Sequence, residues 1–149
     1  MSKGYFAIGI YQPKFEVNIG TLWRTAGIMG ASMLFTIGKR YEFQCSDTVK
    51  TDKNIPLVHF NTLDDALNAK QESVPLVGVE LDERAVSLER FKHPSTAWYL
   101  LGAEDKGLPE SVLSKLDSVV RIPSDKPYSL NVSVAGSIVI YDRYMKGLK

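Results

Sequence analysis

Residues 122–131 place polar side chains and free backbone groups where a predicted strand gives way to a predicted helix. The apolar run over residues 119–122 is typical of a strand, and it ends at Pro123, which cannot donate to a sheet ladder. Ser129 stands where a helix N-cap is expected, with Asn131 in the first turn behind it. A strand end, a loop and a helix N-terminus together offer unpaired N–H groups to a polar ligand. The segment therefore predicts a binding pocket, although many α/β proteins share this arrangement.

Asn18 and Arg24 form a second candidate pair. Asn18 can cap a helix whose apolar positions follow the spacing of one helical face: Ile19, Leu22, Trp23 and Ala26. Helical side chains tilt toward the N-terminus, so the long side chain of Arg24 can reach back toward the loop that holds Asn18. A helix cap and an exposed surface arginine also explain the two residues, so both interpretations stay open at this point.

Other common catalytic motifs are absent from the sequence. It holds no G-x-S-x-G, Walker A or G-x-G-x-x-G pattern. His59 and His93 lie far apart, and neither has a cysteine or a set of acidic residues nearby, so we predict no metal site. The acidic pairs at residues 64–65 and 82–83 are typical of helix starts and turns. Nothing in these patterns indicates a hydrolase.

Three segments resemble the motifs of the SpoU-type (TrmH-like) RNA ribose methyltransferases, members of the knotted SPOUT class. The first reads N-I-G-T-L-W-R-T-A over residues 18–26, and the second reads L-G-A-E-D-K-G-L-P over residues 101–109. The third combines the Ile-Pro pair at residues 122–123 with S-L-N-V-S over residues 129–133. The motifs follow the family's order and cover most of the chain. Because no N-terminal RNA-binding extension is recognisable, the chain is most similar to the minimal, TrmL-like members.

The resemblance implies S-adenosylmethionine as the cofactor and gives roles to residues of all three motifs. The arginine matching Arg24 is the family's principal catalytic residue, and the asparagine matching Asn18 helps to position it. Glu104 would anchor a loop or contact polar groups of cofactor or substrate. Ser129 and Asn131 would combine helix capping with a share in the active site. The residues expected around the cofactor are Val79, Gly102, Ile122, Ser129 and Leu130.

Two chemical roles are open for Arg24. With a pKa above about 12 an arginine stays charged, so binding an RNA phosphate and stabilising the developing ribose alkoxide is the simpler role. The family proposal, in which a substrate phosphate helps the arginine to take the 2′-hydroxyl proton, is the alternative.

Beside the expected cofactor pocket, Gly102 matches the family pattern, while residue 124 and the length of the loop around it depart from that pattern. Gly102 would let the backbone approach the ligand closely, so Gly102→Val is expected to fill ligand space while leaving the fold largely intact. Ser124 stands where the family usually has methionine, and the loop over residues 123–129 is about one residue shorter than usual.

The elements that must position these residues alternate between strands and helices. Strands are predicted at residues 5–11, 33–37, 55–60, 75–81, 96–101 and 119–122, with residues 85–90 ambiguous between an edge strand and a turn. Helices are predicted from Asn18 to the glycines at 27 and 30, over 62–71, from Pro109 at the N1 position, and from Ser129 to about 146. This order indicates an α/β domain with a mostly parallel sheet flanked by helices.

The last helix is the least clear of these elements. Val132, Val134, Ile138 and Ile140 alternate as they would in a strand, and β-branched residues are mediocre helix formers. The small residues at 135–137, which permit close packing, favour a helix. The resemblance further implies a C-terminal trefoil knot and a homodimer, which periodicity cannot show.

Composition sets wider limits on the protein. The 149 residues are 44% apolar and 23% charged, which is typical of a soluble globular protein and fits one domain over residues 1–149. The longest apolar run, residues 138–141, is too short to span a membrane, and the N-terminus lacks a signal-peptide pattern. The single cysteine, Cys45, excludes an internal disulfide, so a cytoplasmic location is expected.

The expected function is methyl transfer to a ribose 2′-hydroxyl of structured RNA, with tRNA preferred over rRNA by analogy. The net charge of +1 does not itself favour nucleic acid, although basic clusters occur at residues 39–40, at residues 50 and 53, and at Lys106. A catalytically silent RNA-binding or scaffold protein is the main alternative. The missing phosphate-loop patterns disfavour another kind of nucleotide-binding domain.

Overall fold

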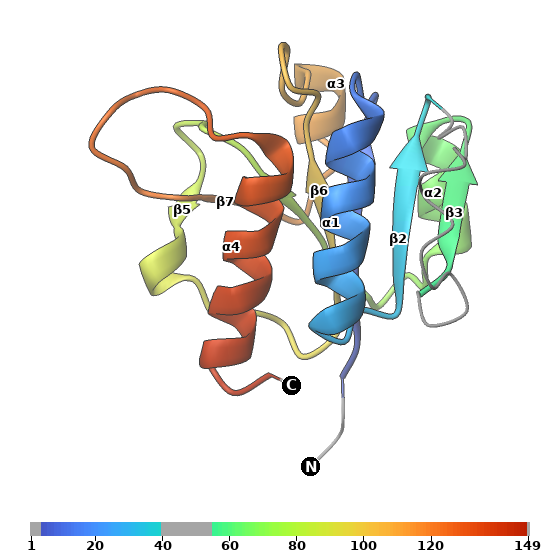
Figure 1. The fold of residues 1–149 in the computed structure, drawn as a ribbon, viewed down its shortest axis with the longest axis horizontal. Coiled ribbons are helices and arrows are strands. Elements are labelled where there is room, and N and C mark those ends of the chain that lie inside the picture. The colour runs from blue at the N-terminus through green and yellow to red at the C-terminus, as the bar shows by residue number, and fades with distance from the viewer. Residues whose placement is uncertain (1–3, 40–54, 149) are drawn as a thin grey trace.

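The computed structural model describes residues 4–39 and 55–148, and the strands in these ranges form one parallel sheet (Figure 1). In chain order they are β1 (Phe6–Tyr11), β2 (Met33–Ile37), β3 (Leu57–Phe60), β4 (Leu76–Val79), β5 (Val86–Ser87), β6 (Ala97–Leu101) and β7 (Ser118–Arg121). Across the sheet the order is β3-β2-β1-β6-β4-β7-β5, and neighbouring strands run parallel. The predicted α/β class is confirmed. The ambiguous segment forms the edge strand β5 and a 3-10 turn at Leu88–Arg90.

Helices cover both faces of this sheet. On one face, α1 (Glu16–Ile28) and α4 (Val132–Met145) lie side by side, as Figure 1 shows. On the other face, α2 (Leu63–Ala69) and α3 (Glu110–Leu113) pack against the strands. The alternation of side chains along each strand sends successive residues to opposite faces, so β6 contributes Tyr99 to one core and Trp98 to the other.

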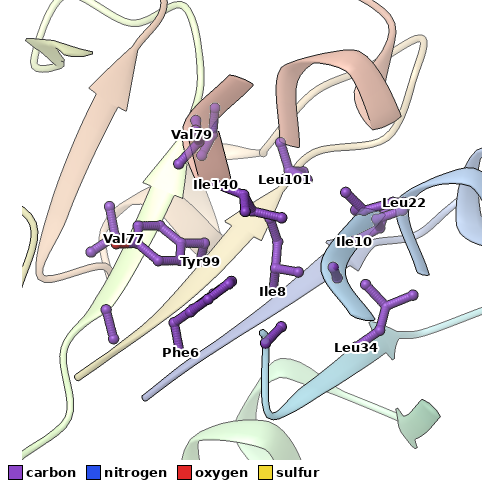
Figure 2. Close-up of a cluster of buried hydrophobic side chains, with 14 of the residues drawn as sticks. Phe6, Ile8, Ile10, Leu22, Leu34, Val77, Val79, Tyr99, Leu101 and Ile140 are labelled. Carbon is purple, nitrogen blue, oxygen red and sulfur yellow. The ribbon is translucent and has the colours of Figure 1, made fainter. Parts of the chain in front are cut away.

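The larger core lies between the sheet and the α1–α4 pair (Figure 2). Ile8 and Ile10 of β1 and Leu101 of β6 meet Leu22 of α1 and Ile140 of α4, and all five are almost fully buried. Burying each such side chain contributes about 1.5–3 kcal/mol, so this core fixes both helices on the sheet. The starts of α1 and α4 carry predicted site residues, so the same core also positions the site.

The C-terminal segment is a helix, as predicted. A Cβ added at Gly136 would lie 2.7 Å from Leu22 Cδ1 and 2.9 Å from Leu101 Cδ1, so glycine lets α4 approach α1 and β6 closely. Its alternating β-branched residues do not mark a strand, because Val132 and Ile140 face the core while Val134 and Ile138 are exposed on the outer face of the helix. Tertiary packing therefore overrides the weak helix propensity.

Two predicted helix caps are wrong. Helix α1 begins at Glu16 with Phe15 at the N-cap position, so Asn18 lies inside the first turn, where it is buried. Helix α4 begins at Val132 with Asn131 as its N-cap, so Ser129 lies two residues ahead of the cap. Pro109, predicted at N1, occupies the N-cap of α3 instead. In α1 the polar side chain is needed for a tertiary contact, described below, and is therefore not available for capping.

Part of the chain lies outside the described residues. The predicted loop over 39–54, with Cys45 and most of the basic clusters, falls there apart from Lys39. None of the helices in the described ranges combines the length and apolar character needed to cross a membrane. The trefoil knot and the extent of the domain over the whole chain stay predictions.

Candidate functional site

The starts of α1 and α4 meet the loops that follow β4, β6 and β7 at the carboxyl edge of the sheet, the upper edge in Figure 1. In open parallel sheets, ligands bind in the crevice outside the carboxyl ends of the strands. All three sequence motifs reach this edge, because the first forms α1, the second follows β6, and the third joins β7 to α4.

A chain of hydrogen bonds joins the three motifs. Asn131 Nδ2 donates to Asn18 Oδ1 at 2.9 Å, and Asn18 Nδ2 donates to Glu104 Oε1 at 2.9 Å. The Glu104 carboxylate also accepts from the backbone N–H of Lys14 at 2.8 Å and of Phe15 at 3.5 Å, just ahead of α1. A carboxylate near a helix N-terminus is favourable, since that end carries partial positive charge. These bonds tie the loop that carries Glu104 to the start of α1, whereas Asn18, predicted to help position Arg24, is hydrogen-bonded to Asn131 and Glu104 instead.

The direction of these bonds is set by the capping of α4. Asn131 Oδ1 accepts from the backbone N–H of Ser133 at 2.9 Å and of Val134 at 3.2 Å. Its amide nitrogen must therefore face Asn18, whose own oxygen accepts and whose nitrogen is left to donate to Glu104. Because Asn18 is only 6% exposed, leaving its amide unpaired would be costly. The start of α4, the first turn of α1 and the loop after β6 are consequently held in one arrangement.

Opposing effects act on the pKa of Glu104. Burial raises the pKa, but the hydrogen bonds donated by Asn18 and by backbone N–H groups, including those of Lys14 and Phe15, together outweigh burial. The net result is a pKa below the ordinary value of 4.5. The carboxylate is therefore ionised near neutral pH and can only accept hydrogen bonds.

This shift predicts how stability depends on pH. Because the folded-state pKa of Glu104 is depressed, its stabilisation is present above the unfolded-state pKa and is lost as pH falls through the folded-state pKa. We expect Glu104→Gln to be less stable than the wild type at pH 7, and the difference to shrink as pH drops below 4.5. Urea unfolding from pH 7 to pH 3 measures this difference. A gap in unfolding free energy that stays constant over that range would contradict the assigned role.

A cavity opens next to this chain of hydrogen bonds. Its lining includes every residue predicted around the cofactor, namely Val79, Gly102, Ile122, Ser129 and Leu130, together with Glu104. Leu101, Val132 and Ala135 add apolar surface, while Glu80, Asp105 and Lys106 add charge. Val79, Gly102 and Ile122 lie at the ends of β4, β6 and β7, where the parallel topology brings them together, and Ser129 and Leu130 lie just ahead of α4.

Gly102 acts differently from the prediction. A Cβ at this position would lie 2.3 Å from the carbonyl carbon of Gly107 and 2.6 Å from the nitrogen of Leu108. The loop after β6 turns back on itself here, with Gly107 N–H donating to the Ala103 carbonyl at 2.9 Å. Gly102 therefore makes room for the loop's own backbone, and the expectation that Gly102→Val leaves the fold intact is wrong.

Arg24 is not part of the cavity. It lies six residues after Asn18 on α1, about 9 Å farther along the axis and roughly 120° around it. Its side chain is exposed, and no hydrogen bond or ion pair joins it to another residue in ranges 4–39 and 55–148. Within these ranges, the guanidinium of Arg24 is therefore exposed on the surface of α1.

Ser129 and the shortened loop line the cavity without capping the helix. Ser129 and Leu130 are exposed, as is Tyr128, which sequence reasoning did not single out. Ser124 Oγ donates to the Lys126 carbonyl at 2.8 Å, so this residue shapes the loop where the family usually has methionine. Glu80 was also missed, although its place directly after a buried strand was a usable signal.

Metal ligands are not gathered at this site. In the ranges 4–39 and 55–148, no group of three or more His, Cys, Asp or Glu side chains could hold an ion. His59 contacts Thr36 of β2, and His93 contacts Tyr99 of β6 and Asp142 of α4, so each histidine has a hydrogen-bonding neighbour within the fold.

Comparison with known proteins gives a consistent result. The model of the SpoU rRNA Methylase family matches residues 5–141. A mouse protein, tRNA (guanosine(18)-2′-O)-methyltransferase TARBP1, is 31% identical in an alignment of 136 residues that covers 84% of this chain and 8% of that protein. The chain therefore spans a small part of this relative.

Solved structures share the fold. A structure described as giving insights into the 2-OH methylation of C/U34 on tRNA has a TM-score of 0.81 and 25% identity, covering 98% of this chain and 99% of that one. An AdoMet-bound rRNA methyltransferase from Sinorhizobium meliloti has a TM-score of 0.85 and 24% identity, covering 99% and 59%.

Proposed function

Because the chain belongs to the SpoU rRNA methylase family, we propose that it transfers a methyl group from S-adenosylmethionine to a ribose 2′-hydroxyl of structured RNA. One observation carries the proposal. The residues predicted to surround the cofactor line a single cavity, and the Asn131–Asn18–Glu104 chain borders it. A silent scaffold would not need this combination of a cavity and a buried polar network, which is expensive unless fully paired.

The lining of the cavity fits the chemistry of this cofactor. Leu101, Ile122 and Leu130 offer apolar surface to a flat purine ring, and the carboxylates of Glu80 and Glu104 offer acceptors to hydroxyl and ammonium groups. When bound, S-adenosylmethionine would supply an electrophilic methyl group on a sulfonium: a nucleophile bonds to the methyl carbon in line as the carbon–sulfur bond breaks, and the neutral thioether S-adenosylhomocysteine leaves. The protein then contributes mainly position and electrostatics.

The residues of this chain divide that work. Asn131, Asn18 and Glu104 hold the loop after β6 and the starts of both helices in register, so the cavity keeps its shape. Arg24 binds a phosphate of the RNA and stabilises the charge that develops on the ribose oxygen. Its planar, permanently charged guanidinium suits this role better than removal of the proton.

The proposal is tested with purified protein, labelled S-adenosylmethionine and total RNA. We expect incorporation of label into RNA and, by calorimetry, binding of the cofactor or of S-adenosylhomocysteine. No heat and no thermal stabilisation at millimolar cofactor would overturn the enzyme assignment. Binding without transfer to any RNA would instead favour the silent RNA-binding alternative.

We prefer tRNA over rRNA as the substrate. Support comes from the structural neighbour concerned with C/U34 on tRNA, which is matched over almost its whole length, although other relatives are named for rRNA. Mass mapping of modified nucleosides in RNA from cells with and without the protein should show one lost 2′-O-methyl group in tRNA. Loss from rRNA alone would overturn this preference. The single cysteine supports a cytoplasmic location for the reaction.

We also propose that the chain works as a homodimer through the outer face of α4. Four large apolar side chains are exposed there around a groove that Thr21 of α1 also lines: Val134 at 47%, Ile138 at 36%, Tyr141 at 55% and Met145 at 63%. Such a patch is unusual on a monomer and is typical of an interface. A second copy placed on it would also bring Arg24, one turn beyond Thr21, close to the interface.

The dimer predicts a mass of about twice 16.6 kDa in sedimentation at micromolar concentration. Tyr141→Glu should shift the protein toward the monomer, because it places a charge in the apolar face. Ser111→Glu is the matched control, since this exposed residue lies on α3 at the opposite face. A wild type that sediments as a strict monomer would contradict the proposal.

A further inference from the structure

We infer that Glu80 is a cofactor-binding residue that accepts hydrogen bonds from ribose hydroxyls, and that it also fixes the loop after β6 against the cavity. The inference rests on the proposed function and deepens it. Glu80 lies outside the three sequence motifs, which cover residues 18–26, 101–109, and 122–123 with 129–133.

Glu80 is placed by the sheet. It follows β4 directly, and its backbone N–H donates to the Val120 carbonyl of β7 at 3.0 Å, so its backbone continues the ladder. Its side chain is half-buried and lines the cavity together with Val79 and Gly102. The carboxylate therefore lies on a rigid element at the carboxyl edge, where parallel sheets bind their ligands.

Among the described residues, the Glu80 carboxylate is held by backbone groups. Glu80 Oε2 accepts from Leu108 N–H at 2.7 Å, and Oε1 accepts from Leu81 N–H at 3.1 Å. In the part of the chain that the structure describes, no lysine, arginine or histidine forms an ion pair with it. An ionised carboxylate has about four acceptor positions, so acceptor capacity is left over on a half-buried charge. A ligand with hydroxyl donors can use that capacity.

The loop after β6 is built around this carboxylate. Gly107 has φ +65°, and a Cβ there would lie 2.5 Å from Glu80 Oε2. Glycine at 107 thus both adopts the left-handed conformation and admits the carboxylate. Leu108 N–H, next along the loop, supplies the short bond to Oε2. The loop is therefore held at Leu108 by the Glu80 carboxylate and at Glu104 by the backbone just ahead of α1.

The chemistry of the cavity favours the ribose as the partner of Glu80. Of the groups on a nucleoside cofactor, the vicinal hydroxyls are paired donors that a single carboxylate can accept. An acidic residue beside a strand end serves this purpose in other α/β nucleotide sites. The apolar residues Leu101, Ile122 and Leu130 suit the purine. The carboxylates of Glu80 and Glu104 are then the groups that can accept hydrogen bonds from the polar parts of the cofactor.

The test compares two ligands on three proteins by calorimetry. The ligands are S-adenosylhomocysteine and its 2′,3′-dideoxyribose analogue. The proteins are the wild type, Glu80→Gln, and the control Glu72→Gln, which alters an exposed glutamate away from the cavity. Glutamine keeps the shape of glutamate and an oxygen for Leu108 N–H, so the loop should persist. Binding of the analogue by Glu80→Gln reports that the cavity is intact.

We expect the wild type and Glu72→Gln to prefer the hydroxylated ligand. In Glu80→Gln the Kd for S-adenosylhomocysteine should rise about 10- to 100-fold, the range of a hydrogen bond to a charged group, while the Kd for the analogue changes less than about threefold. Equal losses for both ligands, or no loss, would overturn the ribose assignment while leaving the proposed function standing. A wild type that binds neither ligand would overturn both.

Discussion

Arg24→Ala is expected to lower the rate of methyl transfer into RNA by about a hundredfold or more. Loss of one charged donor aimed at developing negative charge commonly has this effect. Cofactor affinity should stay within about twofold, because Arg24 does not line the cavity. Unfolding free energy should change by less than about 0.5 kcal/mol, since the side chain is exposed and joined to nothing else in the described ranges. Transfer from labelled cofactor, calorimetry and urea unfolding on the same preparations measure the three quantities.

Two further variants sharpen the result for Arg24. Arg24→Lys should also be poor, because an ammonium cannot reproduce the planar fork that grips a phosphate. Arg90→Ala removes another exposed arginine, at the 3-10 turn away from the site, and should keep normal transfer. Near-normal transfer by Arg24→Ala would defeat the assigned mechanism even if methylation of RNA itself were confirmed.

The sheet was predictable because its strands are apolar runs of the kind that both faces of a parallel sheet require. Ala97–Leu101 is buried at every position, and Phe6–Tyr11 nearly so, which is why no alternation was needed to recognise them. The sequence pattern could not give the strand order, in which β6 lies between β1 and β4. That order depends on contacts between residues far apart in the chain.

The two wrong helix caps have different origins. Asn18 has the residue type of a cap, but its amide is bound by Glu104, 86 positions away, and by Asn131, 113 positions away. Local propensity takes no account of partners so far away in the sequence. The side chain of Asn18 is used in tertiary hydrogen bonds, and the residue lies in the first turn of α1 rather than at its cap. At the other helix the cap residue was within two positions of the prediction, an ordinary boundary error.

The cavity residues were predictable only through the family motifs. Val79, Ile122 and Leu130 are ordinary apolar residues in composition and spacing, and nothing local marks them as lining a cavity. Glu80 was missed because it lies outside those motifs. For Arg24 the sequence pattern suggested too much. The tilt of helical side chains was consistent with an arginine that reaches toward Asn18, but Arg24 lies on the exposed face of α1, whereas Asn18 is buried.

Gly102→Ala should abolish measurable cofactor binding and destabilise the protein by about 1–3 kcal/mol, the usual cost of forcing extra atoms into a packed site. The added Cβ would lie 2.3 Å from the backbone of Gly107, and backbone cannot move aside as a flexible side chain can. Displacing Gly107 and Leu108 would pull Leu108 N–H from Glu80 and shift Glu104 on the same loop. Calorimetry with S-adenosylhomocysteine and urea unfolding measure the two effects.

Gly27→Ala is the matched control for this prediction. Gly27 lies inside α1, and a Cβ there meets no atom within 4 Å. Alanine should therefore stabilise the helix by about 0.5–1 kcal/mol, because it loses less conformational freedom on folding than glycine does. Cofactor affinity should be unchanged. If Gly102→Ala bound the cofactor as tightly as Gly27→Ala does, the folded-back loop after β6 would not be what shapes the cavity, and Gly102 would not have the role of making room for that loop.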